Sequence, residues 1–208
     1  MIAAFGDSMI DTMGENLDYV EIYLKTEYPN TQFKLYNYGI GGENVEMGLA
    51  RWNNPLIYKD RNYPPITQIN ADIIILGSFS YNPFDPHSKD RHWIGLTNLI
   101  NEAKKTNAEI YLMAEIAPLS DGFGQGKNGP NMLPEKAIGQ ANNIIEQLNG
   151  AMNLSIELGI PLINAFTPSQ LNGKYGRRDY VNSDDGIHTS EQGQHFVAQK
   201  IVSVIKLK

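Results

Sequence analysis

An α/β fold with a parallel sheet is the fold class that this sequence predicts. Short apolar runs alternate along the chain with longer segments whose apolar residues recur at helical spacing. The run from Ile73 to Leu76 is apolar without alternation, which is typical of a parallel strand covered on both faces. The chain has 208 residues, of which 41% are hydrophobic, so residues 1–208 are expected to form one domain around a single core.

Five segments are expected to be strands. The first is the apolar run from Ile2 to Phe5, which ends at Gly6. The other four are residues 33–38, 72–76, 109–115 and 161–164. Right-handed crossovers between parallel strands place the loops that follow these strands at one edge of the sheet.

Helices are expected between and after these strands. In the first of them Leu17, Val20 and Leu24 form one apolar stripe, and Pro29 ends it. Thr189 or Ser190 could cap the last one. The expected helices are residues 16–28, 43–51, 93–105, 134–158 and 189–205. The Gly-rich segment 117–133 is an unusually long loop, and a lid and a mobile excursion are equally compatible with it.

Composition excludes several classes of function. The formal net charge is -6 and no Lys/Arg run is present, so a nucleic-acid partner is not expected. The chain has no cysteine, which excludes disulfides, thiolate metal sites and a cysteine nucleophile. His87, His92 and His195 lack metal-ligand spacing and are expected to be surface residues, so neither a metal nor another cofactor is indicated.

Cellular location stays open at this point. No apolar stretch approaches the roughly 20 residues that span a bilayer, so no transmembrane segment is expected. No signal peptide is visible, because the chain enters its first strand almost at once. The chain as it stands fits a cytoplasmic protein, and it equally fits a secreted or anchored one whose upstream signal was removed. The oligomeric state is also open.

Three side chains have the chemistry of acyl transfer. Ser8 directly follows the first strand, while Asp185 and His188 directly precede the last helix. A serine needs a neutral histidine to accept its proton, and a carboxylate orients that histidine and stabilises its charged form. The spacing of three, with Gly186 between, should let the Asp185 carboxylate and the His188 imidazole touch. We therefore expect Ser8 as nucleophile, His188 as base and Asp185 as its partner.

The oxyanion of a tetrahedral intermediate needs hydrogen-bond donors near the nucleophile. Gly42 follows the second strand, and a glycine lets a backbone N–H approach the substrate closely. Asn82 follows the third strand and offers a side-chain amide. The expected oxyanion hole is therefore built from the N–H groups of Ser8 and Gly42 and from Asn82.

These residues resemble the SGNH (GDSL-type) hydrolase family. Gly6-Asp7-Ser8 is similar to its first block, Asn37-Tyr38-Gly39-Ile40-Gly41-Gly42 to its second, and Asp185-Gly186-Ile187-His188 to its last. The resemblance implies a three-layer α/β/α sandwich with a five-stranded parallel sheet, flavodoxin-like in arrangement. It also implies an esterase, lipase or related acyl hydrolase, whose substrates in the family include acetylated sugars, lysophospholipids, thioesters and aryl esters. A small acyl ester, such as an acetylated carbohydrate, is the expected substrate.

The third block departs from the family pattern. The family usually has Gly-x-Asn directly after the third strand, whereas Gly77 here is followed by Ser78-Phe79-Ser80 and the first asparagine is Asn82. Ser78 or Ser80 could supply a hydroxyl donor in place of Asn82. Phe79 and Tyr81 lie in the same loop, and one of them is expected to line the substrate pocket.

Several of the candidate site residues also have simpler interpretations. Ser8 could be a helix cap, Asp184 could replace Asp185, and Gly42 could be required for backbone shape alone. The altered third block would also fit a non-catalytic carbohydrate-binding protein or an acyltransferase of the same fold. A phosphate-binding domain is disfavoured, because neither Gly-rich loop matches a phosphate-binding fingerprint.

Overall fold

The sheet consists of five parallel strands in the order β2-β1-β5-β6-β7. The computed structural model describes residues 1–207. In β1, which lies between β2 and β5, Ala4 lies opposite Asn37 on one side and Ile75 on the other. The strands are β1 (Ile2–Gly6), β2 (Leu35–Gly39), β5 (Ile73–Gly77), β6 (Glu109–Ala114) and β7 (Leu162–Asn164).

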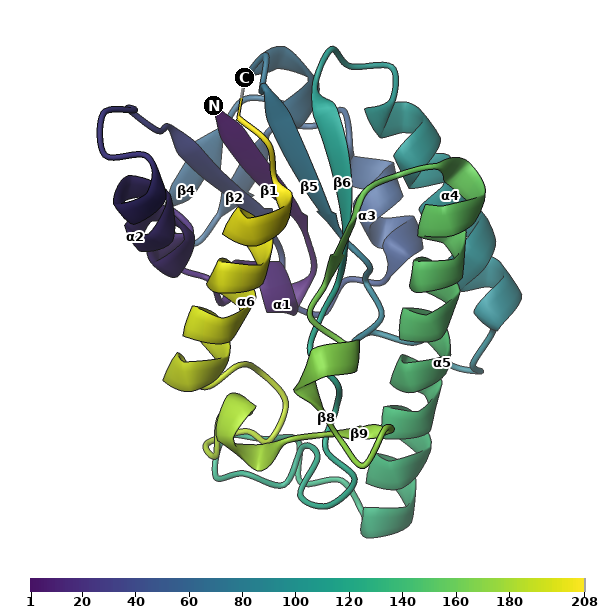
Figure 1. The fold of residues 1–208 in the computed structure, drawn as a ribbon. Helices are drawn as coiled ribbons and strands as arrows, with labels where there is room; N and C mark the ends of the chain where they lie inside the picture. Colours follow the sequence, from purple (N-terminus) through teal and green to yellow (C-terminus); the bar gives the residue numbers. More distant parts are fainter. Residues whose placement is uncertain (208) are drawn as a thin grey trace.

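Helices cover both faces of the sheet (Figure 1), which confirms the three-layer α/β/α sandwich. The sheet divides the hydrophobic core into two clusters, one on each of its faces. Ile2 and Ala4 of β1 pack with the helices of one face, while Ala3 and Phe5 pack with those of the other, as the two-residue period of a strand requires. One face carries α2 (Asp18–Glu27) and α6 (Glu191–Val204), the other carries α3 (Val45–Arg51) and α4 (Lys89–Ala103), and α5 (Pro134–Leu158) contributes to both.

Several short elements lie outside the main sheet and its covering helices. The sequence did not indicate them, because each is too short to show a hydrophobic period. They are α1 (Ser8–Asp11), the hairpin of β3 (Leu56–Tyr58) and β4 (Arg61–Tyr63), the hairpin of β8 (Gln170–Leu171) and β9 (Tyr175–Gly176), and the 3-10 helices Ile66–Gln68, Thr167–Ser169 and Arg178–Tyr180.

Helix α4 corrects two expectations. It begins at Lys89 rather than at residue 93, because the Ser88 side chain accepts a hydrogen bond from Arg91 N and caps the helix there. This places His92 inside α4, where it is buried rather than on the surface. Its Nε2 donates to the Ser78 carbonyl over 2.8 Å. Burial lowers the pKa of His92 to about 4, so its imidazole is neutral at neutral pH.

Both described chain ends lie at the amino ends of the strands (Figure 1). The Met1 ammonium pairs there with the Asp72 carboxylate over 2.5 Å. Helix α1 and the loops after the strands lie at the opposite edge of the sheet. No helix of residues 1–207 combines the length and the apolar character that crossing a bilayer requires.

Candidate active site

Ser8 is the first residue of α1, directly after β1. Asp7 caps this short helix, because its Oδ1 accepts a hydrogen bond from Met9 N over 2.9 Å. Gly6 is needed for the sharp strand-to-helix turn: a Cβ at this position would lie 2.4 Å from Ile10 Cγ1. The turn leaves Ser8 partly exposed at the carboxyl end of β1.

His188 and Asp185 form a hydrogen-bonded pair just before α6. Asp185 Oδ2 lies 2.8 Å from His188 Nδ1, while Asp185 Oδ1 accepts from the backbone N–H groups of Ile187 and His188. Burial raises the pKa of Asp185, but these hydrogen bonds lower it more, so the group is a carboxylate at neutral pH. The neighbouring Asp184 is exposed, and the structure places Asp185 rather than Asp184 on His188.

Asn82 is held against the nucleophile turn. Its Nδ2 donates to Asp7 Oδ2 over 2.9 Å, which leaves the second amide hydrogen for another acceptor. Asp7 thus connects the loop after β1 with the loop after β5. It is fully buried, and burial raises its pKa despite the hydrogen bonds from Met9 and Asn82.

The loop from Gly77 to Asn82 rests on a second buried carboxyl group, Glu115. Glu115 Oε1 accepts from Ser78 N over 2.7 Å, and Oε2 accepts from the Ser78 hydroxyl. The hydroxyls of Ser78 and Ser80 are themselves 2.6 Å apart. Burial and the nearby Asp7 carboxyl raise the pKa of Glu115 well above its usual range. Ser78 and Ser80 are therefore engaged below the loop, and both are fully buried.

Gly42 lies after β2 with a φ of 79°, which glycine adopts without strain. A Cβ on Gly42 would meet nothing within 4 Å, so backbone conformation rather than space accounts for glycine here. Within residues 1–207, no protein acceptor takes the backbone N–H of Gly42 or of Ser8. Both groups can therefore donate to a bound molecule.

One cavity of about 420 Å³ joins these residues. It brings together Ser8, Gly42, Asn82 and His188, which come from four separate loops, and Asp185 stands behind His188. The structure of residues 1–207 contains no hydrogen bond between Ser8 and His188, and such contacts are often formed only when substrate is bound. The remaining lining residues are Asp11, Thr12, Gly41, Lys59, Tyr81, Phe123, Met132, Gln140 and Ile187.

Of the two aromatic candidates, Tyr81 lines the cavity and Phe79 does not. Tyr81 lines the cavity and anchors its hydroxyl on the Ile116 carbonyl over 2.8 Å. Phe79 does not line it, which corrects the expectation for this residue. Its φ of 57° turns the side chain into the core, where the ring lies 5.9 Å from that of Phe5 and fills the space above Gly48.

The Gly-rich loop 117–133 forms part of the cavity wall through Phe123 and Met132. Its backbone is hydrogen-bonded to the turn that carries Asp185, since Gly124 N donates to Gly186 O over 3.3 Å. Gly126 permits this approach, because a Cβ there would lie 2.3 Å from the Asp184 carbonyl carbon. The loop thus packs directly on the His188 turn.

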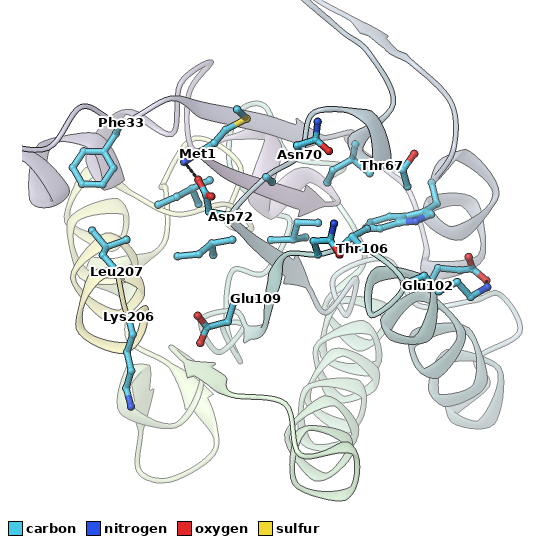
Figure 2. Close-up of a pocket in the computed structure, with 18 of the residues that line it drawn as sticks. Met1, Phe33, Thr67, Asn70, Asp72, Glu102, Thr106, Glu109, Lys206 and Leu207 are labelled. Carbon is cyan, nitrogen blue, oxygen red and sulfur yellow. Dashed lines mark hydrogen bonds and ion pairs between the residues drawn. The ribbon is translucent and has the colours of Figure 1, made fainter.

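A larger hollow of about 760 Å³ lies at the opposite edge of the sheet (Figure 2). Met1, Asp72, Glu109 and Lys206 are among its lining residues, and the Met1–Asp72 ion pair lies within it. None of the candidate catalytic residues lines this hollow. Within residues 1–207 no group of three histidine, aspartate or glutamate residues could hold a metal ion.

In parallel α/β sandwiches, small-molecule ligands bind at the carboxyl ends of the strands, where this cavity lies. The sequence model of the GDSL-like lipase/acylhydrolase family matches residues 2–201. The chain belongs to this family and is an ester-bond hydrolase. None of the curated proteins compared with the chain matches it significantly.

Solved structures of this family share the fold. The chain is similar to a lipase/acylhydrolase from Enterococcus faecalis, with a TM-score of 0.70, 18% identity and coverage of 97% of this chain and 93% of that one. A catalytic mutant of Axe2, an acetylxylan esterase from Geobacillus stearothermophilus, gives 0.69 at 15% identity, covering 100% and 94%. The acetyl xylan esterase AlAXEase gives 0.67 at 20% identity, covering 97% and 98%.

Several lining residues were not indicated by the sequence. Asp11 reaches the cavity from α1, and Lys59 reaches it because the β3–β4 hairpin packs against the end of β2, a segment far away in the chain. Glu115 supports the loop after β5 without lining the cavity, and it was not singled out from the sequence. Its signal in the sequence is an acidic residue directly after the apolar strand β6.

Proposed function

We propose that the protein hydrolyses small carboxylic esters through an acyl-enzyme formed on Ser8. The observation that carries this proposal is the gathering of Ser8, Gly42, Asn82 and His188 around one cavity, with the Asp185 carboxylate on His188 Nδ1. A hydrogen-bonded Asp-His pair beside a serine at a strand-to-helix turn is the arrangement that activates a serine hydroxyl.

The reaction has two halves. In the first, Ser8 Oγ attacks the ester carbonyl carbon while His188 Nε2 accepts the hydroxyl proton, and Asp185 stabilises the imidazolium. The tetrahedral intermediate collapses as His188 returns that proton to the departing alcohol. In the second half, His188 takes a proton from water, the resulting hydroxide attacks the acyl carbon, and the acid leaves as Ser8 regains its proton.

Three donors stabilise the oxyanion in both halves. They are the N–H groups of Ser8 and Gly42, which no protein acceptor within residues 1–207 occupies, and the free amide hydrogen of Asn82. Each donor of this kind contributes about 3 kcal/mol to lowering the barrier. Asp7 supports the set by holding both the Ser8 turn and the Asn82 amide.

An acetylated carbohydrate is the substrate that we propose first. The cavity of about 420 Å³ suits a short acyl group better than a long chain. Two of the similar structures are acetylxylan esterases, which supports acetyl groups on sugars as the bonds cleaved here.

The test is hydrolysis of 4-nitrophenyl acetate by the wild type, by Ser8→Ala and by Ser203→Ala, an exposed serine on α6 that serves as control. We expect Ser8→Ala to lose at least about 10⁴-fold in kcat and Ser203→Ala to match the wild type. A fluorophosphonate probe should label Ser8 alone, as read by peptide mass spectrometry. A Ser8→Ala variant that cleaves the ester at the wild-type rate would overturn the proposal.

The substrate class is tested separately by measuring acetate released from acetylated xylo-oligosaccharides and fatty acid released from 4-nitrophenyl octanoate. The proposed substrate predicts a higher kcat/KM for the acetylated sugar. A preference for octanoate, together with Ser8 labelling, would retain the mechanism and reject the carbohydrate substrate. A protein that binds acetylated sugar without cleaving any ester would be the non-catalytic relative.

A further inference from the structure

A hairpin turn places one lysine at the cavity. Lys59 is the first residue of the two-residue turn between β3 and β4, and it lines the same cavity as Ser8. Its Nζ lies 2.8 Å from Asp11 Oδ2 and 5.2 Å from the centre of the Tyr58 ring. The side chain remains 58% exposed, so the ammonium group is held in place and still accessible to a ligand.

The Lys59 charge is not neutralised by its partner. Asp11 Oδ1 already accepts from Arg61 Nη2 over 2.5 Å, and both of these side chains are buried. Arg61 also donates to the carbonyls of Asn37 and Gly39, which makes it an integral part of the edge of the sheet. One carboxylate is therefore shared by two cations, and the cluster keeps a net charge of about +1 at the cavity wall.

The other carboxyl groups near the cavity are engaged by partners other than Lys59, which within residues 1–207 is paired with Asp11 alone. Glu43 is paired with Arg51, and Asp185 is hydrogen-bonded to His188. Asp7 is buried beneath the nucleophile turn, where it accepts hydrogen bonds from Met9 N and Asn82 Nδ2. Asp60, the second residue of the hairpin turn, is exposed and does not line the cavity.

Gly41 shows how close the cluster is to the nucleophile. A Cβ built on Gly41 would lie 3.9 Å from Ser8 Cβ and 3.7 Å from Asp11 Oδ2, the oxygen that holds Lys59. The nucleophilic residue and the lysine-bound carboxylate oxygen thus both lie within 4 Å of one position next to Gly41. An ester whose carbonyl lies at Ser8 can reach Lys59 with a substituent only a few bonds away.

The backbone at the turn supports a role for the side chain. Lys59 has a φ of 54°, a left-handed conformation in a position where a hairpin turn usually has glycine. Residues held in sparsely populated backbone conformations are enriched at ligand-binding and active sites. The opposite wall, built from Tyr81, Phe123 and Met132, is mostly apolar, so the cavity is asymmetric in charge.

We propose that Lys59 forms a subsite for an anionic group on the substrate, so that the enzyme prefers esters that carry a carboxylate near the scissile bond. This inference rests on the proposed ester hydrolysis at Ser8 and adds to it the chemical class of the substrate. The carboxylate can belong to the acyl half or to the alcohol half of the ester.

Two pairs of esters test the proposal. A comparison of mono-4-nitrophenyl adipate with 4-nitrophenyl hexanoate tests for recognition of a carboxylate on the acyl half. A comparison of 4-acetoxybenzoate with 4-acetoxybenzamide tests for recognition of a carboxylate on the alcohol half. The measured quantity is the ratio of kcat/KM for the anionic ester to kcat/KM for its neutral partner. In at least one pair we expect Lys59→Met to lower this ratio roughly 4- to 20-fold, and added salt to lower it in the wild type.

Two further variants control for charge and structure. Lys59→Arg should retain the ratio, because it restores the cation at the same position. Lys105→Met removes the same charge from the opposite edge of the sheet and should leave the ratio unchanged. A ratio that Lys59→Met changes less than twofold in both pairs, or that Lys105→Met lowers equally, would overturn the subsite.

Binding separates this proposal from the proposed function. In the Ser8→Ala background, titration calorimetry with the intact anionic esters measures affinity without catalysis. We expect Lys59→Met to weaken that binding by the same factor as the ratio. Weakened binding in a protein that cleaves no ester would retain the subsite and reject the hydrolysis, whereas unchanged binding with Ser8-dependent cleavage would do the reverse.

Discussion

Asn82 is the residue at which this chain departs furthest from the spacing of its family. The loop after β5 is longer than the usual pattern, yet the amide still reaches the cavity beside Ser8 and Gly42. It does so because Ser78 binds Glu115 below the loop and Asp7 holds the Asn82 amide above it. These buried hydrogen bonds thus hold the longer loop in a conformation that keeps the Asn82 amide beside the cavity.

Replacing Asn82 by alanine should therefore lower kcat roughly 100- to 1000-fold while KM changes little, because the lost donor acts mainly on the transition state. The measurement is steady-state hydrolysis of 4-nitrophenyl acetate. Asn54→Ala, an exposed amide after α3, is the matched control and should keep the wild-type rate. A proportional rise in KM with unchanged kcat would instead assign Asn82 to ground-state binding.

Among the elements, α6 begins just after His188, the proposed base. The Ser190 hydroxyl caps the helix by accepting from Gly193 N over 3.1 Å and donates to the Asp179 carbonyl over 2.6 Å. These bonds anchor the segment that begins with Asp185 and His188. The start of α6 and the geometry of the proposed base are thus parts of one local structure.

Loss of this cap gives the prediction for the element. Ser190→Ala should lower the free energy of unfolding by about 1 kcal/mol, measured by urea denaturation. Ser203→Ala, near the other end of the same helix, removes an exposed hydroxyl that donates to Lys200 O and should change stability by less than about 0.5 kcal/mol. Equal losses in the two variants would contradict the assignment of Ser190 as the cap.

Elements with a clear period were predictable from the sequence. All five strands of the sheet and the helices α2 to α6 correspond to apolar runs or periodic segments of the sequence, and the bounds of α5 match the expected 134–158. The β3–β4 hairpin was not indicated, because its strands are only three residues long and their position depends on distant partners. Arg61 donates hydrogen bonds to the carbonyls of Asn37 and Gly39, and no pattern in the local sequence indicates such contacts.

The same distinction applies to the candidate site. Ser8, Asp185 and His188 lie in short motifs that a sequence displays directly. Lys59 reaches the cavity only through the folded hairpin, and Phe79 turns away from it because of a left-handed backbone that the sequence does not reveal.

At the scale of the whole molecule, the buried carboxyl of Glu115 connects stability to pH. It lies between the sheet and the nucleophile turn, and burial raises its pKa above the ordinary value of 4.5. The native state therefore keeps a proton that the unfolded chain releases. Above about pH 4.5 the unfolded state binds fewer protons than the native state, so this group makes the protein less stable as pH rises.

Glu115→Gln removes this titration while keeping the shape of the side chain. We expect its free energy of unfolding, relative to the wild type, to rise between about pH 5 and pH 8, with a slope of at most about 1.4 kcal/mol per pH unit. Urea denaturation at several pH values measures it. Glu157→Gln, on the exposed face of α5, should show no such trend, and a pH-independent difference for Glu115→Gln would contradict the prediction.

The placement of the chain ends has a practical consequence. Met1 and Leu207 both line the hollow at the amino edge of the sheet, while the ester cavity lies at the opposite edge (Figures 1 and 2). A carrier domain or a solid support attached near either residue would stand on the far side of the molecule from Ser8. Immobilisation through Met1 or Leu207 would thus leave the ester cavity turned towards the solution.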